Sequence, residues 1–236
     1  MIQLRKANDR GHADHGWLRT FHSFSFADYH DPAEMGWGVL RVINEDFVAP
    51  DTGFGTHGHR DMEIITYLLS GTLQHRDSMN NSSVIRPGEV QRMSAGEGVQ
   101  HSEFNPSNSE TVHFLQLWIE PNVFGCPPEY EQKTFPDADK RDRLCLLASP
   151  DGDEGSLSIH QDARLFASLL TPETHLEHKL ALGRRAYLHV VRGAITLNGL
   201  PLGSGDGAKI KEEAKLSIVA KEDAEILMFD LPTARR

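Results

Sequence analysis

Cysteine is scarce in this sequence: among its 236 residues only Cys126 and Cys145 occur. Neither belongs to a CxxC or another metal-type spacing, so the chain offers no thiolate metal site and no disulfide framework. Long apolar runs are missing too. The stretch MIQLRKANDRGHADHGWLRT at the start carries charges throughout, and no run approaches the roughly 20 residues of a membrane-spanning helix. These absences predict a soluble, cytoplasmic protein that does not bind a membrane.

Basic residues are outnumbered, with 24 Lys and Arg against 34 Asp and Glu, which gives a formal net charge of -10. They form no cluster larger than short pairs such as Arg184-Arg185. A surface of this kind does not neutralise a phosphate backbone, so nucleic acid is not an expected partner. A small neutral or metal-chelating ligand suits this charge better.

Long helical periodicity is nearly absent, whereas short runs of β-branched and aromatic residues recur along the chain. Gly, Asn, Asp or Pro separates these runs, which is typical of an antiparallel sandwich or barrel. The expected strands cover residues 37–43, 62–69, 83–88, 90–96, 111–119, 186–199, 215–220 and 225–232. One short helix is expected at QDARLFASLL, residues 161–170. The predicted fold class is therefore all-β.

The two halves of the chain are similar around a glycine turn. Aligning Gly193 with Gly71, an offset of 122 residues (193 minus 71), superposes HVVRGAIT on YLLSGTLQ. This repeat predicts two similar β-domains in tandem. The proline-rich and charged stretch CPPEYEQKTFPDADKRDR, residues 126–143, suits a linker. We therefore expect one domain of residues 1–135 and a second of residues 136–236.

Two short motifs after glycine-rich turns carry side chains that bind metals. GTHGH places His57 and His59 at positions i and i+2, which share one face of a strand. GEGVQHSE places His101 and Glu103 in the same relation, 42 residues after His59 (101 minus 59). If the returning chain lays the second pair beside the first across a barrel, three imidazoles and a carboxylate converge. Such a set holds a divalent transition metal, and the lack of thiolates disfavours a closed structural zinc site.

The identity of the carboxylate stays open at this level. Glu63 has the same odd-number parity as His57 and His59, so on an unbroken strand it faces the same way, and periodicity does not choose between it and Glu103. In either case four protein ligands leave two adjacent positions on a six-coordinate ion, as in a catalytic site.

The competing explanation is that the two histidines of HxH are spaced this way by chance. The chain contains 13 histidines, which makes such a pattern more frequent at random. The conjunction of HxH with HxE, glycine turns and an all-β frame favours a metal site. The other histidines are expected to be surface or hydrogen-bonded core residues, namely His12, His15, His22, His30, His75, His113, His160, His175, His178 and His189.

The segments GTHGHRDMEIITYLLSG, FHSFSFADYHDP, GWGVLRVINED and MSAGEGVQHSEFNP resemble motifs of the pirin family of cupins, close to its bacterial quercetin 2,3-dioxygenase-like members. The similarity covers essentially the whole chain. It implies a bicupin of two antiparallel β-barrels (jelly rolls), with a metal in the first barrel on His57, His59, His101 and Glu103. Glu63 then becomes either a pocket residue or a residue that contacts the ligands without binding the metal. Fe(II) is the ion the resemblance favours, with Cu, Ni, Mn, Co or Zn as alternatives. Gly58 departs from the pattern, because the family commonly has proline between the two histidines.

The resemblance implies an oxidoreductase that cleaves a flavonol such as quercetin with O2 and releases CO. Glu103 is expected to act also as the catalytic proton acceptor, and Phe21, Phe24, Phe26 and Trp37 to line an apolar pocket. The alternative is a binding protein, an iron-dependent redox sensor of the pirin type. A metal-assisted isomerase or hydrolase is a third class, since cupins host many reactions on one frame. A monomer is expected.

The second domain is expected to lack the metal site. Adding the offset of 122 (193 minus 71) to the four ligand positions gives Lys179, Ala181, Asp223 and Glu225, so both histidines are replaced. His175 and His178 are nearby but have opposite strand parity. We expect this domain to be structural or to shield the first barrel.

Overall fold

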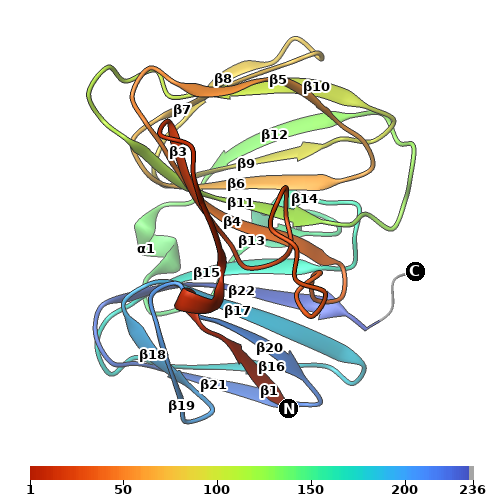
Figure 1. The fold of residues 1–236 in the computed structure, drawn as a ribbon. Coiled ribbons are helices and arrows are strands. Elements are labelled where there is room, and N and C mark those ends of the chain that lie inside the picture. Colours follow the sequence, from red (N-terminus) through yellow and green to blue (C-terminus); the bar gives the residue numbers. More distant parts are fainter. Residues whose placement is uncertain (234–236) are drawn as a thin grey trace.

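The computed structural model describes residues 1–233, and its architecture is almost entirely β (Figure 1). Four sheets are stacked in layers; the two outer sheets have four strands each and the two inner sheets have seven. Each half of the molecule is one outer sheet packed on one inner sheet, the two-layer arrangement of a jelly roll. The predicted all-β, two-barrel fold is confirmed.

The first half lies at the top of Figure 1. Its inner sheet runs in the order β12-β9-β6-β11-β4-β3-β2 and its outer sheet in the order β5-β10-β7-β8. The inner strands are β2 (Gly11–Asp14), β3 (Leu18–His22), β4 (Leu40–Val48), β6 (Glu63–Ser70), β9 (Glu89–Ser94), β11 (Val112–Ile119) and β12 (Glu129–Thr134). The outer strands are β5 (Gly53–His59), β7 (Leu73–Asp77), β8 (Ser82–Ile85) and β10 (Val99–Phe104).

The second half repeats this order below it. Its inner sheet is β1-β20-β17-β22-β15-β13-β14 and its outer sheet is β16-β21-β18-β19. The inner strands are β1 (Ile2–Arg5), β13 (Cys145–Ser149), β14 (Leu157–Ser158), β15 (Arg164–Leu170), β17 (Arg184–Arg192), β20 (Gly207–Lys211) and β22 (Ala224–Pro232). The outer strands are β16 (His175–Lys179), β18 (Ala194–Leu197), β19 (Leu200–Gly203) and β21 (Lys215–Ala220). Strand β1 pairs with β20, so the chain starts in the second half before it crosses to the first.

Helical structure is confined to short pieces among the described residues: η1 (Ala7–Asp9), α1 (Asp137–Lys140) and η2 (Asp153–Gly155). None of these helices has the length or the apolar composition to cross a membrane. The helix predicted for residues 161–170 was wrong, because residues 164–170 form β15 between β13 and β22. Both faces of β15 are covered, Leu165 and Ala167 by one core and Leu170 by another. An apolar run buried on both faces has no helix-or-strand signature. The expected linker also contains a paired strand, β12.

The repeat around the glycine turn is real. Gly71 follows β6 with φ of 78° and Gly193 follows β17 with φ of 79°, left-handed values that favour glycine at both turns. The order of the outer sheets makes β21 the counterpart of β10. Asp223 and Glu225 instead lie just before and within β22, the counterpart of β11, so their assignment to ligand positions was wrong. The hairpins of the second half are shorter, so the offset of 122 residues (193 minus 71) found at the glycine turn does not hold between β10 and β21.

The core is distributed differently in the two barrels. One apolar cluster joins the inner sheets, with residues such as Ile65 and Leu117 from the first half and Tyr187 and Phe229 from the second. The interior of the second barrel is filled by a single apolar cluster. In the first barrel, the apolar residues form two smaller clusters, one around Phe114 and one around Met93 and Val99. A cavity lined by residues of the first half lies in this barrel.

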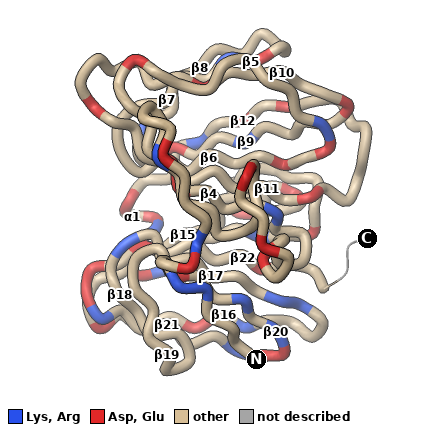
Figure 2. Tube along the Cα trace, in the orientation of Figure 1, with Lys and Arg blue, Asp and Glu red and all other residues tan. Residues whose placement is uncertain are grey.

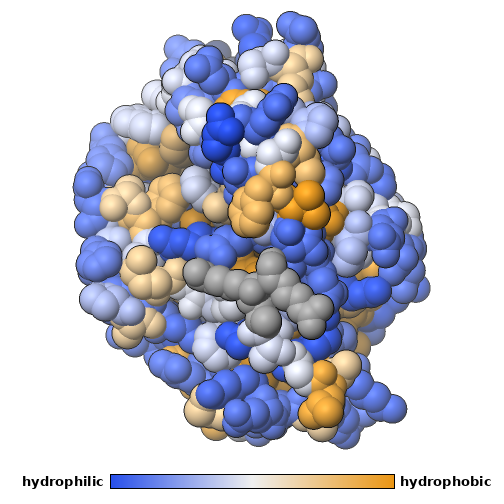
Figure 3. All heavy atoms as spheres, turned by 90° about the vertical axis from the view of Figure 1, so that its right-hand side faces the viewer, coloured by the Kyte–Doolittle hydropathy of each residue, from blue (hydrophilic) through white to orange (hydrophobic). Residues whose placement is uncertain are grey.

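Charges and exposed apolar groups are scattered over the surface. Figure 2 shows basic and acidic residues interspersed in both halves, and the face seen in Figure 3 is mainly hydrophilic with small apolar groups. Exposed large apolar side chains in the described part of the chain are Met1, Met35, Phe104, Val123, Phe124, Leu182 and Leu200.

Candidate metal centre

Adjacent antiparallel strands bring the predicted ligands together. Strands β5 and β10 pair with His101 opposite His57 and Val99 opposite His59. The register shifts between His101 and Glu103, where three positions of β5 match two of β10. Such a bulge redirects side chains. It leaves the three histidines on one face and places Phe54 opposite Glu103.

The three imidazoles touch one another. Ring centroids are 4.4 Å apart for His57 and His101, 4.8 Å for His57 and His59, and 4.8 Å for His59 and His101. The Nε2 atoms of His59 and His101 are separated by 2.9 Å. One nitrogen from each ring lies within 4.8 Å of the others. The structure therefore groups His57, His59 and His101 as the sequence predicted.

Local backbone contacts fix this arrangement. The Nδ1–H of His57 donates to the carbonyl oxygen of Gly55 at 2.8 Å, which leaves Nε2 of His57 as the free lone pair. Gly53 at the start of the strand is required by space, because a Cβ there would lie 2.2 Å from the Glu103 carbonyl oxygen. Gly58 has no such constraint, since its nearest neighbour would be 3.7 Å away.

Burial keeps two of the rings neutral. It lowers the pKa of His59 to about 4, and the nearby His57 adds to this effect. It lowers the pKa of His101 to about 2, with further contributions from His57, His59 and His75. Neutral imidazoles retain the lone pair that a metal needs.

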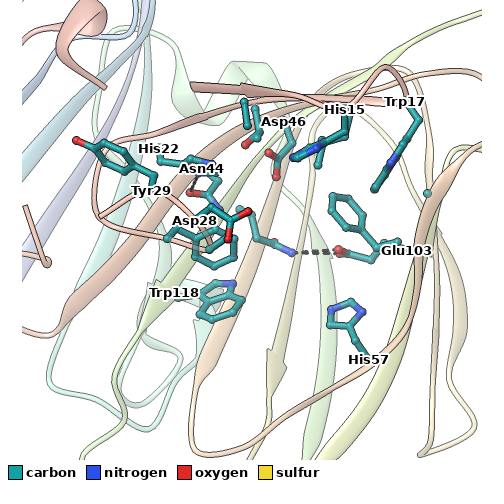
Figure 4. A pocket seen from close by; sticks show the side chains of 18 of the residues that line it. His15, Trp17, His22, Asp28, Tyr29, Asn44, Asp46, His57, Glu103 and Trp118 are labelled. Carbon is teal, nitrogen blue, oxygen red and sulfur yellow. Dashed lines mark hydrogen bonds between the residues drawn. The ribbon is translucent and has the colours of Figure 1, made fainter. Parts of the chain in front are cut away.

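Glu103 lies beside this group rather than within it. Its carboxylate forms a second group of possible ligands with His75 and His101. Gln116 Nε2 donates to both carboxylate oxygens at 3.3 and 3.1 Å, and Figure 4 shows this contact at the cavity wall. Burial raises the pKa of Glu103 to about 7, while the hydrogen bond from Gln116 opposes the shift and Asp46 adds to it.

His75 was expected to be a surface or hydrogen-bonded core residue, and the structure shows the latter. It is fully buried on β7, and its Nε2–H donates to Asp77 Oδ2 at 3.0 Å. Its register opposite Glu103 on β10 brings it to the edge of the histidine group.

Glu63 is held elsewhere. Its carboxylate accepts a hydrogen bond from Ser94 Oγ at 2.7 Å and contacts His160 Nδ1 at 3.3 Å. The parity argument assumed one continuous strand, but Asp61 has a φ of 47° in the turn that separates β5 from β6. Glu63 therefore belongs to the inner sheet, and the prediction that it is a pocket residue was wrong.

A cavity of about 610 Å³ opens beside the histidines, within the roughly 300–1,000 Å³ of typical ligand pockets. Its walls include His57, His59 and Glu103.

Of the aromatic residues predicted to line the cavity, only Phe26 does so. Phe21 packs on Phe47, whereas Phe24 and Trp37 belong to the core between the halves. The sequence missed Trp17, Phe54 and Trp118, together with the polar residues His22, Asn44, Asp46 and Gln116. Alternation along β4 and β11 places Asn44 with Asp46 and Gln116 with Trp118 on shared faces, but it does not show that these faces meet the cavity.

The residues present fit a divalent transition metal. Two imidazole nitrogens bound at right angles, each about 2.1 Å from one ion, lie about 3 Å apart, close to the 2.9 Å between His59 and His101. His57 offers its Nε2 lone pair to the same group, because its Nδ1–H is held by the carbonyl oxygen of Gly55. Imidazole and carboxylate donors suit iron, nickel, copper and zinc.

Comparisons with known proteins agree with this geometry. The family model described as Pirin matches residues 3–119, and the model of the quercetinase C-terminal cupin domain matches residues 146–231. The chain is 50% identical over 232 residues to a quercetin 2,3-dioxygenase of Escherichia coli K12, covering 98% of this chain and 99% of that protein. It is 43% identical over 231 residues to a pirin-like protein of Caulobacter vibrioides, with 98% and 99% covered.

Solved structures share this fold, and one of them is a metal complex. The crystal structure of the bacterial pirin YhhW from Escherichia coli in complex with nickel(II) superposes with a TM-score of 0.94 at 48% identity, covering 98% of this chain and 99% of that one. A quercetin 2,3-dioxygenase from Acinetobacter baumannii has a TM-score of 0.79 at 21% identity, with 98% and 86% covered, and shares the fold.

Proposed function

Because this chain belongs to the pirin family of cupins, we propose that it is a metal-dependent dioxygenase that cleaves a flavonol such as quercetin with O2. The observation that carries the proposal is the cavity that joins a cluster of three histidines to aromatic walls. The relative named quercetin 2,3-dioxygenase is similar over nearly the whole length of both chains, which supports the same chemistry here. Breaking the two ring bonds to C3 releases that carbon as CO, and both oxygen atoms of O2 remain in the ring-opened product.

We assign the metal to His57, His59, His101 and Glu103. Fe(II) is our proposed ion, and the nickel(II) complex of the bacterial pirin supports a divalent ion of this class. When bound, the metal supplies open positions for the 3-hydroxyl and 4-carbonyl of a flavonol, a lowered pKa for that hydroxyl, and redox chemistry toward O2.

Glu103 is the proton acceptor in this proposal. Its carboxylate faces the cavity, and as a ligand of the assigned metal it lies within reach of a hydroxyl bound beside it. Gln116 Nε2 holds both oxygens by hydrogen bonds, which fixes the plane of the carboxylate. The proton leaves the substrate hydroxyl for a Glu103 oxygen that is already oriented.

Aromatic side chains position the planar substrate. Phe26 and Trp118 pack edge to face with centroids 5.3 Å apart, and Trp118 also meets His59 at 5.0 Å. These rings connect the apolar wall to the histidines, so a flat ligand against them reaches the metal centre. They also exclude water from the reacting carbon atoms.

Turnover assays under air and under nitrogen test the proposal. Protein of measured metal content is mixed with quercetin while flavonol absorbance and CO are followed. We expect flavonol loss and CO release under air only, and much slower turnover after zinc replaces iron, because zinc has no redox chemistry. Equal rates in both atmospheres, or no loss of quercetin by iron-loaded protein, would favour the redox-sensor alternative.

A further inference from the structure

A row of polar side chains crosses the inner sheet of the first barrel. Neighbouring strands place Gln91 opposite Thr66, Thr66 opposite Gln116, Gln116 opposite Asn44, and Asn44 opposite His22. All five are buried. Polar groups in a barrel interior cost free energy unless they are paired or meet a ligand. The hydrogen bonds of each member therefore show where a ligand is needed.

Toward the metal centre, Thr66 and Gln116 are satisfied by protein. Thr66 Oγ1 donates to Gln116 Oε1 at 2.9 Å, and Gln116 Nε2 donates to the Glu103 carboxylate. Gln91 Nε2 lies 3.4 Å from His75 Nδ1, whereas Gln91 Oε1 has no partner among residues 1–233 but does not line the cavity. This part of the row positions the groups around the histidines and has little capacity left for a ligand.

The other end is only half satisfied. The Nδ1–H of His22 donates to Asn44 Oδ1 at 2.8 Å. This bond leaves His22 Nε2 as an acceptor and Asn44 Nδ2 as a donor, and no residue of the described chain, 1–233, engages either atom. Both side chains line the cavity. Figure 4 shows them across the cavity from His57.

A carboxyl group extends this polar surface. Asp46 is the next residue of β4 on the same face as Asn44, and it pairs across the strands with Thr20. It is 5% exposed and lines the cavity. Together, His22, Asn44 and Asp46 offer an acceptor nitrogen, a donor amide and carboxyl oxygens within one wall of the cavity.

We propose that His22, Asn44 and Asp46 form a hydroxyl-binding wall. This wall recognises phenolic hydroxyl groups on the B ring of a flavonol, the phenyl substituent that does not bind the metal. The inference deepens the proposed function and rests on it. A phenolic hydroxyl both donates and accepts, so it matches the mixed donors and acceptors of the wall. A site built to bond hydroxyl groups discriminates against analogues that lack them, because its polar groups are then left unpaired. The wall thus selects polyhydroxylated flavonols.

Anaerobic binding measurements test the wall without turnover. Metal-loaded protein under nitrogen is titrated with quercetin and with galangin, a flavonol that lacks hydroxyl groups on the B ring. Binding is followed by the fluorescence of Trp17 and Trp118 in the cavity. We expect quercetin to bind at least about tenfold more tightly. Asn44→Leu and, independently, His22→Phe should weaken quercetin binding about fivefold or more and leave galangin binding unchanged. Exposed Asn108 supplies the matched control, Asn108→Leu.

Thermal unfolding first shows that each variant is folded. The ratio of the dissociation constants for galangin and quercetin then decides the outcome. The proposed role of the wall is contradicted if the ratio of the two dissociation constants is unchanged in both variants. It is also contradicted if both ligands lose affinity equally. If the wild-type protein binds quercetin more tightly than galangin but does not consume quercetin in air, the binding role of the wall is supported and the dioxygenase proposal fails. If quercetin is consumed but the ratio is insensitive to both substitutions, only the wall fails.

Discussion

His59 and His101 bring their Nε2 atoms within 2.9 Å of each other although 42 positions separate them in the sequence. Direct pairing of β5 with β10 creates this contact, and burial keeps both rings neutral by lowering the pKa of each. The strands thus position two imidazole nitrogens of the proposed site before a metal arrives. Little rearrangement is needed for binding, which favours tight metal binding.

Removing one of the three histidines should release the metal. We expect about one ion per chain in the wild-type protein and a large loss in His57→Ala and in His101→Ala, because each variant removes one donor of the group. Elemental analysis after dialysis against a weak chelator measures this. His175→Ala, a change to an exposed histidine of β16, is the control and should retain the ion. Full occupancy in both cluster variants would rule out the assigned site.

The two glutamates should behave differently. Glu103→Gln is expected to weaken metal retention, since the charged oxygen near His101 is lost. Glu63→Gln should leave the metal content largely intact, because its partners are Ser94 and His160 on the other side of the sheet. Competition with a chelator gives the two affinities. The reverse order would mean that Glu63 supplies the carboxylate.

The second half of the molecule holds the cavity wall through a buried ion pair. Lys209 Nζ of β20 lies 2.6 Å from Glu34 Oε2, with side chains 5% and 7% exposed. Glu34 belongs to the segment between β3 and β4 that also carries Phe26 and Tyr29 of the cavity. Lys209→Met should lower the free energy of unfolding by about 3 kcal/mol or more, because it leaves a buried charge unpaired.

Urea denaturation of the full-length protein measures this loss, and Lys215→Met is the control. Lys215 forms an equally short pair with Glu177, at 2.6 Å, but both side chains are about half exposed. Its removal should cost less than about 1 kcal/mol. The double change Lys209→Met with Glu34→Leu should recover most of the stability. Equal effects of the two single lysine changes would contradict a role for burial.

Stability should depend on pH through Glu45. Burial alone raises the pKa of this carboxyl, but the hydrogen bond from His113 and the charge of Arg10 outweigh it and lower the pKa to about 2. A folded-state pKa below the unfolded value gives stability that is present above the unfolded pKa and is lost as pH falls toward the folded one. The difference in unfolding free energy between wild type and Glu45→Gln should shrink by about 1 kcal/mol between about pH 7 and about pH 4. A constant difference would contradict the lowered pKa.

Local patterns in the sequence were sufficient for the histidine group. Positions i and i+2 share a strand face whatever the partner strand is, so His57 and His59 had to point the same way once β5 formed. Turn residues and β-branched runs likewise gave most of the strands. The resemblance to pirins led us to propose Glu103 as the carboxylate ligand, a choice that periodicity alone left open.

Long-range pairing determined what the sequence did not reveal. The polar wall depends on the register of β3 with β4 and of β4 with β11, and no local signal specifies that register. Glu63 was misplaced because a turn at Asp61 interrupts the strand on which the parity argument relied. The segment 161–170 was misassigned because burial on both faces removes periodicity.

The fate of oxygen atoms tests the central claim most directly. Iron-loaded protein is given quercetin under dioxygen labelled with the heavy isotope of oxygen, and the ring-opened product is analysed by mass spectrometry beside His57→Ala as the control. Dioxygenation on the assigned site predicts two labelled oxygen atoms in the product, unlabelled CO, and no product from the variant. A product that carries oxygen from water, or equal labelling by the variant, would contradict the account.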